Sequence, residues 1–88
     1  MKRPITDRER TFVISMLGRC NFNVVANRKN CINFKVSENS KTYSISHSSH
    51  YMYHITQIDT GNTYGYMTDI IDLMSFIWTE RNNTSIFS

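Results

Sequence analysis

The sequence has little of what stabilises many small secreted domains, and this narrows the class of protein. It contains two cysteines among 88 residues, Cys20 and Cys31. Two cysteines are too few for the dense disulfide framework of such domains. No secretory leader is indicated, because Pro4 and the charged stretch 7–10 stand where an apolar run would be needed. We therefore expect a cytoplasmic protein whose two thiols are free.

Long hydrophobic runs and catalytic signatures are also lacking. The most apolar stretch, 67–78, contains Asp69 and Asp72 and falls short of the roughly 20 residues that a membrane-spanning helix needs. No phosphate-binding loop, nucleophile elbow or His-Glu-x-x-His motif occurs in the sequence. The sequence therefore predicts no membrane association, no cofactor and no enzymatic activity.

Leucine and alanine are scarce, although both favour helices. The chain has two Leu and one Ala against ten Ile and nine Asn. Isoleucine and asparagine have AT-rich codons, so the simplest account is an AT-biased genome. Small accessory proteins of tailed bacteriophages often have this composition, as do many proteins of low-GC bacteria. If the protein is phage-encoded, the compartment is the host cytoplasm.

Two helices are indicated by periodicity. Thr6 and Glu9 form a capping box, and a helix over Asp7–Leu17 follows, with Gly18 as its stop. Its apolar stripe is Phe12, Val13, Met16 and Leu17. A second amphipathic helix is predicted near the C-terminus from the spacing of Met67, Ile70, Ile71, Met74, Ile77 and Trp78.

Alternating residues between the two helices predict strands. Polar and apolar residues alternate over 22–26, 32–36 and 42–46, with turn residues between them. A fourth strand is predicted within 47–58. The fold class is α+β, a single domain over 1–88: an N-terminal helix, a three- to four-stranded antiparallel meander and a C-terminal amphipathic helix.

Charge is divided unequally along the chain. Residues 1–44 carry nine Lys or Arg and three acids, whereas 45–88 carry one Arg and four acids. A basic half concentrates polyanions, although a net charge of +3 is also ordinary for a solvated surface. The candidate residues for binding nucleic acid or an acidic partner are Arg3, Arg8, Arg10, Arg19, Arg28, Lys29, Lys35 and Lys41.

The predicted order of elements is similar to that of double-stranded-RNA-binding domains in topology alone. Those domains carry a basic cluster where their C-terminal helix begins. Here the corresponding residues, Tyr66–Asp69, include an acid and no base. The sequence therefore does not indicate that family, and any RNA would contact the first helix and the meander.

Tyrosines and histidines form two further groups. Tyr51, Tyr53, Tyr64 and Tyr66 are candidates for aromatic contact with bases or a protein, with core packing as the favoured alternative. His47, His50 and His54 lie close in sequence. They could bind zinc with Cys20 or Cys31, or act as acid and base in a small metal-free hydrolase. Neither alternative has a supporting motif, and no metal is expected.

The second helix has apolar residues beyond its predicted stripe. Leu73 and Phe76 lie off that stripe, which indicates that a second copy covers them in a homodimer.

These observations favour a small non-enzymatic regulatory protein with a macromolecular target. Its target would be a protein, either alone or together with RNA. A phage-type inhibitor of a host nuclease, toxin or defence complex is the first hypothesis. A nucleic-acid-binding module is the second, and the small hydrolase is a distant third.

Overall fold

The fold was taken from a computed structural model of the chain, which describes residues 4–38, 40–47, 53–67 and 69–83. Two helices enclose five strands in the sequence. The elements are α1 (Asp7–Arg19), β1 (Asn23–Asn27), β2 (Cys31–Lys35), β3 (Thr42–His47), β4 (Tyr53–Gln57), β5 (Thr63–Met67) and α2 (Ile70–Asn83).

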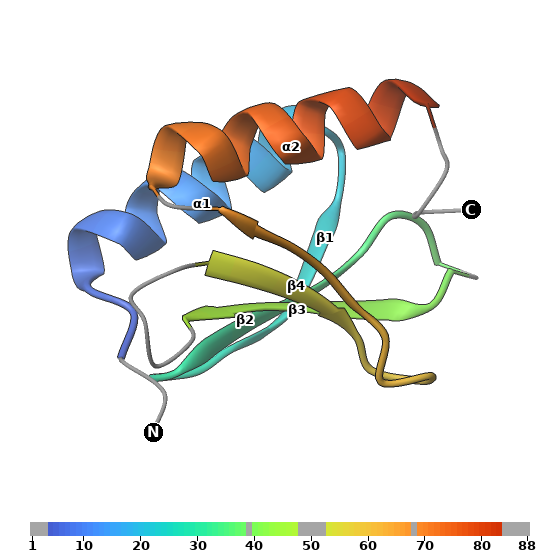
Figure 1. The fold of residues 1–88 in the computed structure, drawn as a ribbon, viewed down its shortest axis with the longest axis horizontal. Helices are drawn as coiled ribbons and strands as arrows, with labels where there is room; N and C mark the ends of the chain where they lie inside the picture. Colours follow the sequence, from blue (N-terminus) through green and yellow to red (C-terminus); the bar gives the residue numbers. More distant parts are fainter. Residues whose placement is uncertain (1–3, 39, 48–52, 68, 84–88) are drawn as a thin grey trace.

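The five strands form one antiparallel sheet whose order follows the sequence, β1-β2-β3-β4-β5. Both helices lie over the same face of this sheet and run in the same direction, from left to right in the view of Figure 1. The α+β class, with a helix before and a helix after an antiparallel meander, is confirmed. The sheet has one strand more than the sequence predicted: Met67, assigned above to the C-terminal helix, lies in β5.

Helix α1 begins at the predicted residue, Asp7, and ends at Arg19, two residues beyond the predicted end. The Thr6 hydroxyl accepts a hydrogen bond from the backbone N–H of Glu9 at 3.2 Å, and the Glu9 carboxylate accepts the Thr6 N–H at 3.0 Å. Gly18 does not stop the helix. Asn21 does, because it adopts a φ of 62°, a left-handed conformation that asparagine tolerates better than most residues.

Strand register separates the sheet into a covered face and an open face. Ile32, Tyr43 and Ile55 have buried side chains, and neighbouring pairs across β2, β3 and β4 bring Ile32 opposite Ile45 and Ile45 opposite Ile55. Since side chains alternate along a strand, the residues between them lie on the face that carries no helix. The fold is thus two layers, helices on sheet.

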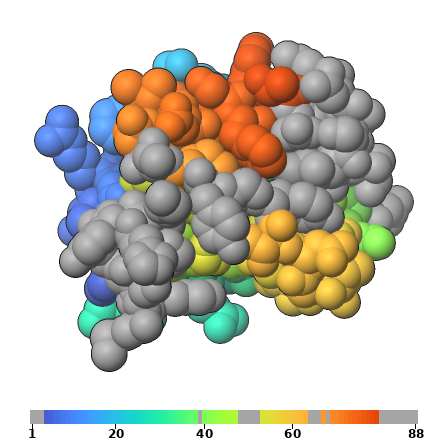
Figure 2. All heavy atoms as spheres, viewed as in Figure 1, coloured from blue at the N-terminus to red at the C-terminus, as the bar shows by residue number. Residues whose placement is uncertain are grey.

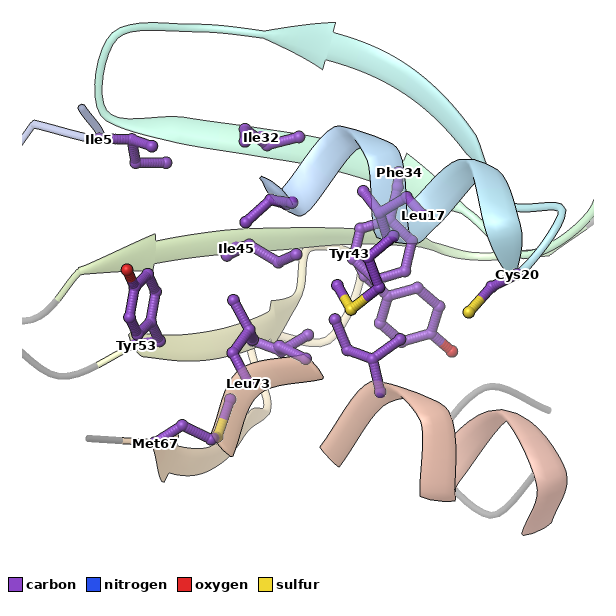
Figure 3. Packing of buried hydrophobic residues seen from close by; sticks show 14 residues of the cluster. Ile5, Leu17, Cys20, Ile32, Phe34, Tyr43, Ile45, Tyr53, Met67 and Leu73 are labelled. Atoms are coloured by element: carbon purple, nitrogen blue, oxygen red, sulfur yellow. The ribbon is translucent and has the colours of Figure 1, made fainter. Parts of the chain in front are cut away.

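The core lies between the two helices and the covered face of the sheet (Figure 3). An aromatic row crosses the sheet within it. The rings of Phe22 and Phe34 stack at 5.7 Å, and those of Phe34 and Tyr43 at 5.6 Å. Helix α1 contributes Val13, Met16 and Leu17, all buried. Phe12, predicted to share that stripe, is instead 47% exposed.

Helix α2 buries part of the predicted stripe, since Ile77 is buried and Ile70 and Met74 pack against the core. The exposed residues of that stripe are Ile71 and Trp78. Leu73 and Ile77 are fully buried, whereas Ile71 and Trp78 are 69% and 51% exposed. Phe76 is half-buried and packs against the core. Leu73 is therefore not available for the self-association predicted for it, because its side chain is buried inside one copy of the chain. For half-buried Phe76 that role stays a prediction.

Candidate binding surfaces

An open apolar groove runs between the outer sides of the two helices. Its larger hollow has a volume of about 370 Å³ and a second hollow of about 190 Å³ adjoins it. We call this surface the helix groove; its lining residues are Phe12, Ser15, Met16, Arg19, Met74, Ser75 and Trp78. In the space-filling view, the orange-to-red atoms of α2 form the upper part of the molecular surface, above the yellow β4–β5 turn (Figure 2).

The chemistry of the helix groove is that of a protein interface. Phe12 and Trp78 each expose about half of their surface, and Arg19 and Trp78 line the same hollow. Trp, Phe, Met and Arg are enriched in protein–protein contacts, and Trp and Arg are frequent among the residues that dominate binding energy. Sequence periodicity missed this site because it assigned Phe12 and Trp78 to the core.

The open face of the sheet is polar. One row across it runs from Asn33 to Ser44, Thr56 and Thr63. The other described members of this face on β2, β3 and β4 are Cys31, Lys35, Thr42, Ser46 and His54. Among these residues there is one lysine and no acid. Such a face can hydrogen-bond to a polar ligand, but polar residues are also usual on the solvated face of an antiparallel sheet.

The predicted basic residues do not form one patch. Ile5 donates its N–H to the Lys29 carbonyl at 3.0 Å, so Arg28 and Lys29 lie at the end of the molecule where α1 begins and where Arg8 lies. Arg19 closes α1 about 16 Å further along the helix axis. Lys35 ends β2, next to Thr42, and Lys41 precedes β3, at that second end. Arg3 lies outside the described residues.

Arg10 has a structural role that the sequence did not indicate. Its guanidinium donates to the side-chain oxygen of Asn27, to the Ile5 carbonyl at 3.2 Å and to the Lys29 carbonyl at 3.3 Å. These bonds fasten the N-terminal segment and the β1–β2 turn to α1. Arg10 is therefore not a candidate for ligand binding.

A polar cluster lies beneath the first turn of α1. Oε2 of Glu9 lies 3.0 Å from Nε2 of the fully buried His47, and Tyr53 donates its hydroxyl to the same oxygen. The rings of His47 and Tyr53 meet edge to face at 4.3 Å. Burial by itself raises the pKa of the Glu9 carboxyl, but the hydrogen bonds from Tyr53 and Thr6, with His47 nearby, outweigh it and lower the pKa to about 2.

The two described histidines lie on opposite faces of the sheet. His47 pairs with Tyr53 on the covered face, whereas His54 pairs with Ser46 on the open face, where His54 Nε2 lies 2.9 Å from Ser46 Oγ. His47 and His54 therefore cannot act together as acid and base on one substrate. The Ser46–His54 pair is not a nucleophile site either, because Ser46 is only 1% exposed. His50 lies outside the described residues.

Of the four tyrosines predicted as aromatic contacts, Tyr53 is the one whose side chain the structure describes. Tyr53 belongs to the core, with its hydroxyl bound to Glu9, so it is not an aromatic contact. Tyr51 and the side chains of Tyr64 and Tyr66 lie outside the described part. Neither cysteine is in a disulfide; Cys20 is buried and Cys31 is half-buried.

Neither a metal site nor a membrane span emerges from the described ranges. No three His, Cys, Asp or Glu side chains among the described residues could together hold a metal ion. No helix in the part that the structure describes combines the length and the apolar character needed to cross a bilayer.

Comparisons with known proteins found no relative that informs the site. No family model matches the chain, and neither the curated proteins nor the solved structures gave a significant match.

Proposed function

We propose that the protein is a small non-enzymatic binding protein that acts by covering a surface of another protein with its helix groove. The observation that carries the proposal is the exposure of Phe12 and Trp78 at two adjoining hollows. Trp78 lines the larger hollow and Phe12 the smaller, and Arg19 lines both. Covering such residues with a partner is favourable, because each Å² of apolar surface removed from water contributes about 25 cal/mol to the free energy of binding.

We propose the same class of target that the sequence indicates. A chain of this size with an AT-biased composition suits a phage-type inhibitor of a host nuclease, toxin or defence complex in the host cytoplasm. Inhibition by coverage needs no catalytic group, only a complementary surface. The helix groove supplies apolar anchors, and the polar residues Ser15 and Ser75 supply hydrogen-bonding groups within it.

The proposal is tested by comparing partner capture between matched variants. Wild-type protein, a Phe12→Ala/Trp78→Ala variant and an Ile58→Ala control are purified from the same cells, and co-purifying proteins are quantified by mass spectrometry. Ile58 is a suitable control because it is 49% exposed and follows buried Gln57, so it lies toward the open side of the sheet.

We expect one stoichiometric partner retained by wild type and control, and lost from the groove variant. Thermal unfolding of all three proteins ensures that the loss does not come from misfolding. Equal capture by the groove variant, or no partner retained by wild type, would overturn the proposal.

Nucleic-acid binding is a second candidate, supported by one observation. The described open-face residues of β2, β3 and β4 carry one lysine and no acid, with exposed Arg28 and Lys29 at one end. Phosphate contacts would make the affinity fall steeply with salt. Replacing Arg8, Arg28 and Lys29 together by Glu should abolish such binding. A flat salt response or unchanged binding of this variant would exclude the candidate.

A further inference from the structure

Each helix presents an exposed stripe beside the helix groove. The stripe of α1 recurs at helical spacing and consists of Arg8, Thr11, Phe12, Ser15, Gly18 and Arg19, all exposed. The stripe of α2 consists of Ile71, Asp72, Ser75, Trp78 and Thr79, also all exposed. Residues of both stripes line the helix groove, namely Phe12, Ser15 and Arg19 from α1 and Ser75 and Trp78 from α2, so the two stripes flank it.

The large side chains on the two stripes have the same spacing. Phe12 and Arg19 are seven positions apart on α1, and Ile71 and Trp78 are seven positions apart on α2. Seven residues are close to two helical turns. The helices run in the same direction (Figure 1), and Arg19 and Trp78 line the same hollow. Phe12 therefore lies level with Ile71, and Arg19 level with Trp78.

This arrangement is complementary to itself under a two-fold rotation. A two-fold axis lying along the helix groove places α1 of one copy on α2 of the other, with levels preserved. Phe12 then meets the second copy's Ile71, and Arg19 meets the ring of its Trp78 as a cation–π pair. Both contacts occur twice, because the two copies are related by symmetry.

Charge favours the same pairing. The exposed stripe of α1 carries Arg8 and Arg19, with Asp7 in the first turn, whereas α2 opens with exposed Asp69 and Asp72. Placing α1 on α2 of a second copy sets a basic stripe against an acidic one. A like-on-like arrangement, α1 on α1, would instead bring arginines together. Opposite charges across an interface stabilise it and select the register.

We propose that a second copy of the chain covers the helix groove, so that self-association regulates access to it. The inference rests on the proposed function in one respect: the second copy and the target compete for one surface. The dimer masks Phe12 and Trp78 when no target is present, and the target binds the monomer. Interface residues Phe12, Ile71 and Trp78 replace Leu73 in the predicted self-association surface.

The test measures mass against concentration by sedimentation equilibrium. Wild type should pass from the 10.4 kDa chain to twice that mass between micromolar and millimolar concentrations. Ile71→Arg should raise the dimer dissociation constant by about 30-fold or more, as expected for a central interface residue. Ile58→Arg on the open side of the sheet should leave it unchanged.

Charge exchange gives a second, independent measurement. Arg8 lies one turn before Phe12 on α1, so in this register it faces the acidic beginning of the second copy's α2. Arg8→Glu and Asp72→Lys should each weaken the dimer, and the two together should restore part of the affinity. A monomer at all concentrations, a dimer unaffected by Ile71→Arg, or no recovery in the double variant would overturn the inference.

Failure of this inference can be told apart from failure of the proposed function. Ile71 does not line the helix groove, so Ile71→Arg should keep the ability to capture a target, and capture more of it because the competing copy is gone. A monomeric protein whose target capture depends on Trp78 refutes only the dimer. A dimer with no groove-dependent partner refutes only the proposed target.

Discussion

The carboxylate of Glu9 joins the beginning of α1 to two strands. One oxygen accepts the backbone N–H of Thr6 at 3.0 Å, and the other lies 3.0 Å from Nε2 of buried His47. The Tyr53 hydroxyl donates to that second oxygen. Only 17% of the Glu9 side chain is exposed. A single side chain thus caps a helix and satisfies polar groups beneath it, and its loss should affect all three elements.

The first prediction is that Glu9 makes the free energy of unfolding depend on pH in the acid range. The pKa of its carboxyl is lowered from 4.5 to about 2 in the folded protein. As pH falls through this window, the unfolded chain takes up a proton that the folded chain does not, so stability falls. The contribution of Glu9 to the free energy of unfolding is fully present above about pH 4.5 and amounts to about 3 kcal/mol.

Urea unfolding at several pH values measures this effect. The stability difference between wild type and Glu9→Gln should be large near neutrality and should shrink as the pH approaches 2. Glu38→Gln, at an exposed carboxylate of the β2–β3 turn, is the matched control. A wild-type-to-Glu9→Gln difference that does not change with pH would contradict the assignment.

The second prediction concerns which side of α2 faces the core. Leu73 is fully buried and Ile71 is 69% exposed. Leu73→Ala should cost roughly 2–5 kcal/mol through lost burial and the cavity it leaves. Ile71→Ala should stay within about 0.5 kcal/mol at concentrations where the chain is monomeric. Thermal or urea unfolding of both variants measures these losses of stability. A larger loss in Ile71→Ala than in Leu73→Ala would mean that Ile71, and not Leu73, faces the core.

The sequence predicted α1 and the central strands well because their patterns allow one solution. Val13, Met16 and Leu17 recur at helical spacing, and Ile32 and Phe34 alternate with polar neighbours. Helix α2 allowed two solutions, because Ile77 belongs to a stripe of helical spacing with Ile71 and Trp78 on one side and to another with Leu73 on the other side. Only the position of α2 on the sheet selects between them, and that depends on contacts distant in sequence.

The candidate site was harder to predict for the same reason. The Glu9–Tyr53 hydrogen bond joins residues 44 positions apart, and no local pattern reports such a pair. The capping box revealed one function of Glu9 and gave no sign of the second. Likewise, the helix groove exists because α1 and α2 lie side by side on one face of the sheet, so its lining could not be read from either helix alone.

The third prediction is that Gly18→Ala stabilises the protein. Gly18 lies within α1, and an added Cβ would meet no atom within 4 Å. Alanine favours a helix interior by up to about 1 kcal/mol over glycine, with a smaller gain near the helix end. The melting temperature should rise. If it falls, the backbone at Gly18 must adopt a conformation that alanine resists, and α1 would end earlier than Arg19.

The fourth prediction separates two arginines of α1 that the sequence placed in one set. Arg10 donates hydrogen bonds to Asn27 and to the carbonyls of Ile5 and Lys29, whereas Arg8 is exposed. Arg10→Ala removes all three of these bonds, and only the Lys29 carbonyl keeps another donor, the Ile5 N–H. This variant should cost roughly 1–3 kcal/mol. Arg8→Ala should change stability by less than about 0.5 kcal/mol.

Hydrogen exchange can show where the loss from Arg10→Ala arises. The bond from the Ile5 N–H to the Lys29 carbonyl lies beside the Arg10 guanidinium, so the amide of Ile5 should exchange faster in Arg10→Ala than in wild type. Amides in the middle of β3 should change only as far as global stability does. Arg10→Lys is an informative companion, because an ammonium keeps the charge but cannot span three acceptors with a planar fork. If Arg10→Lys is as stable as wild type, the positive charge is sufficient and the planar guanidinium is not needed. The structural role assigned to its three hydrogen bonds would then be wrong.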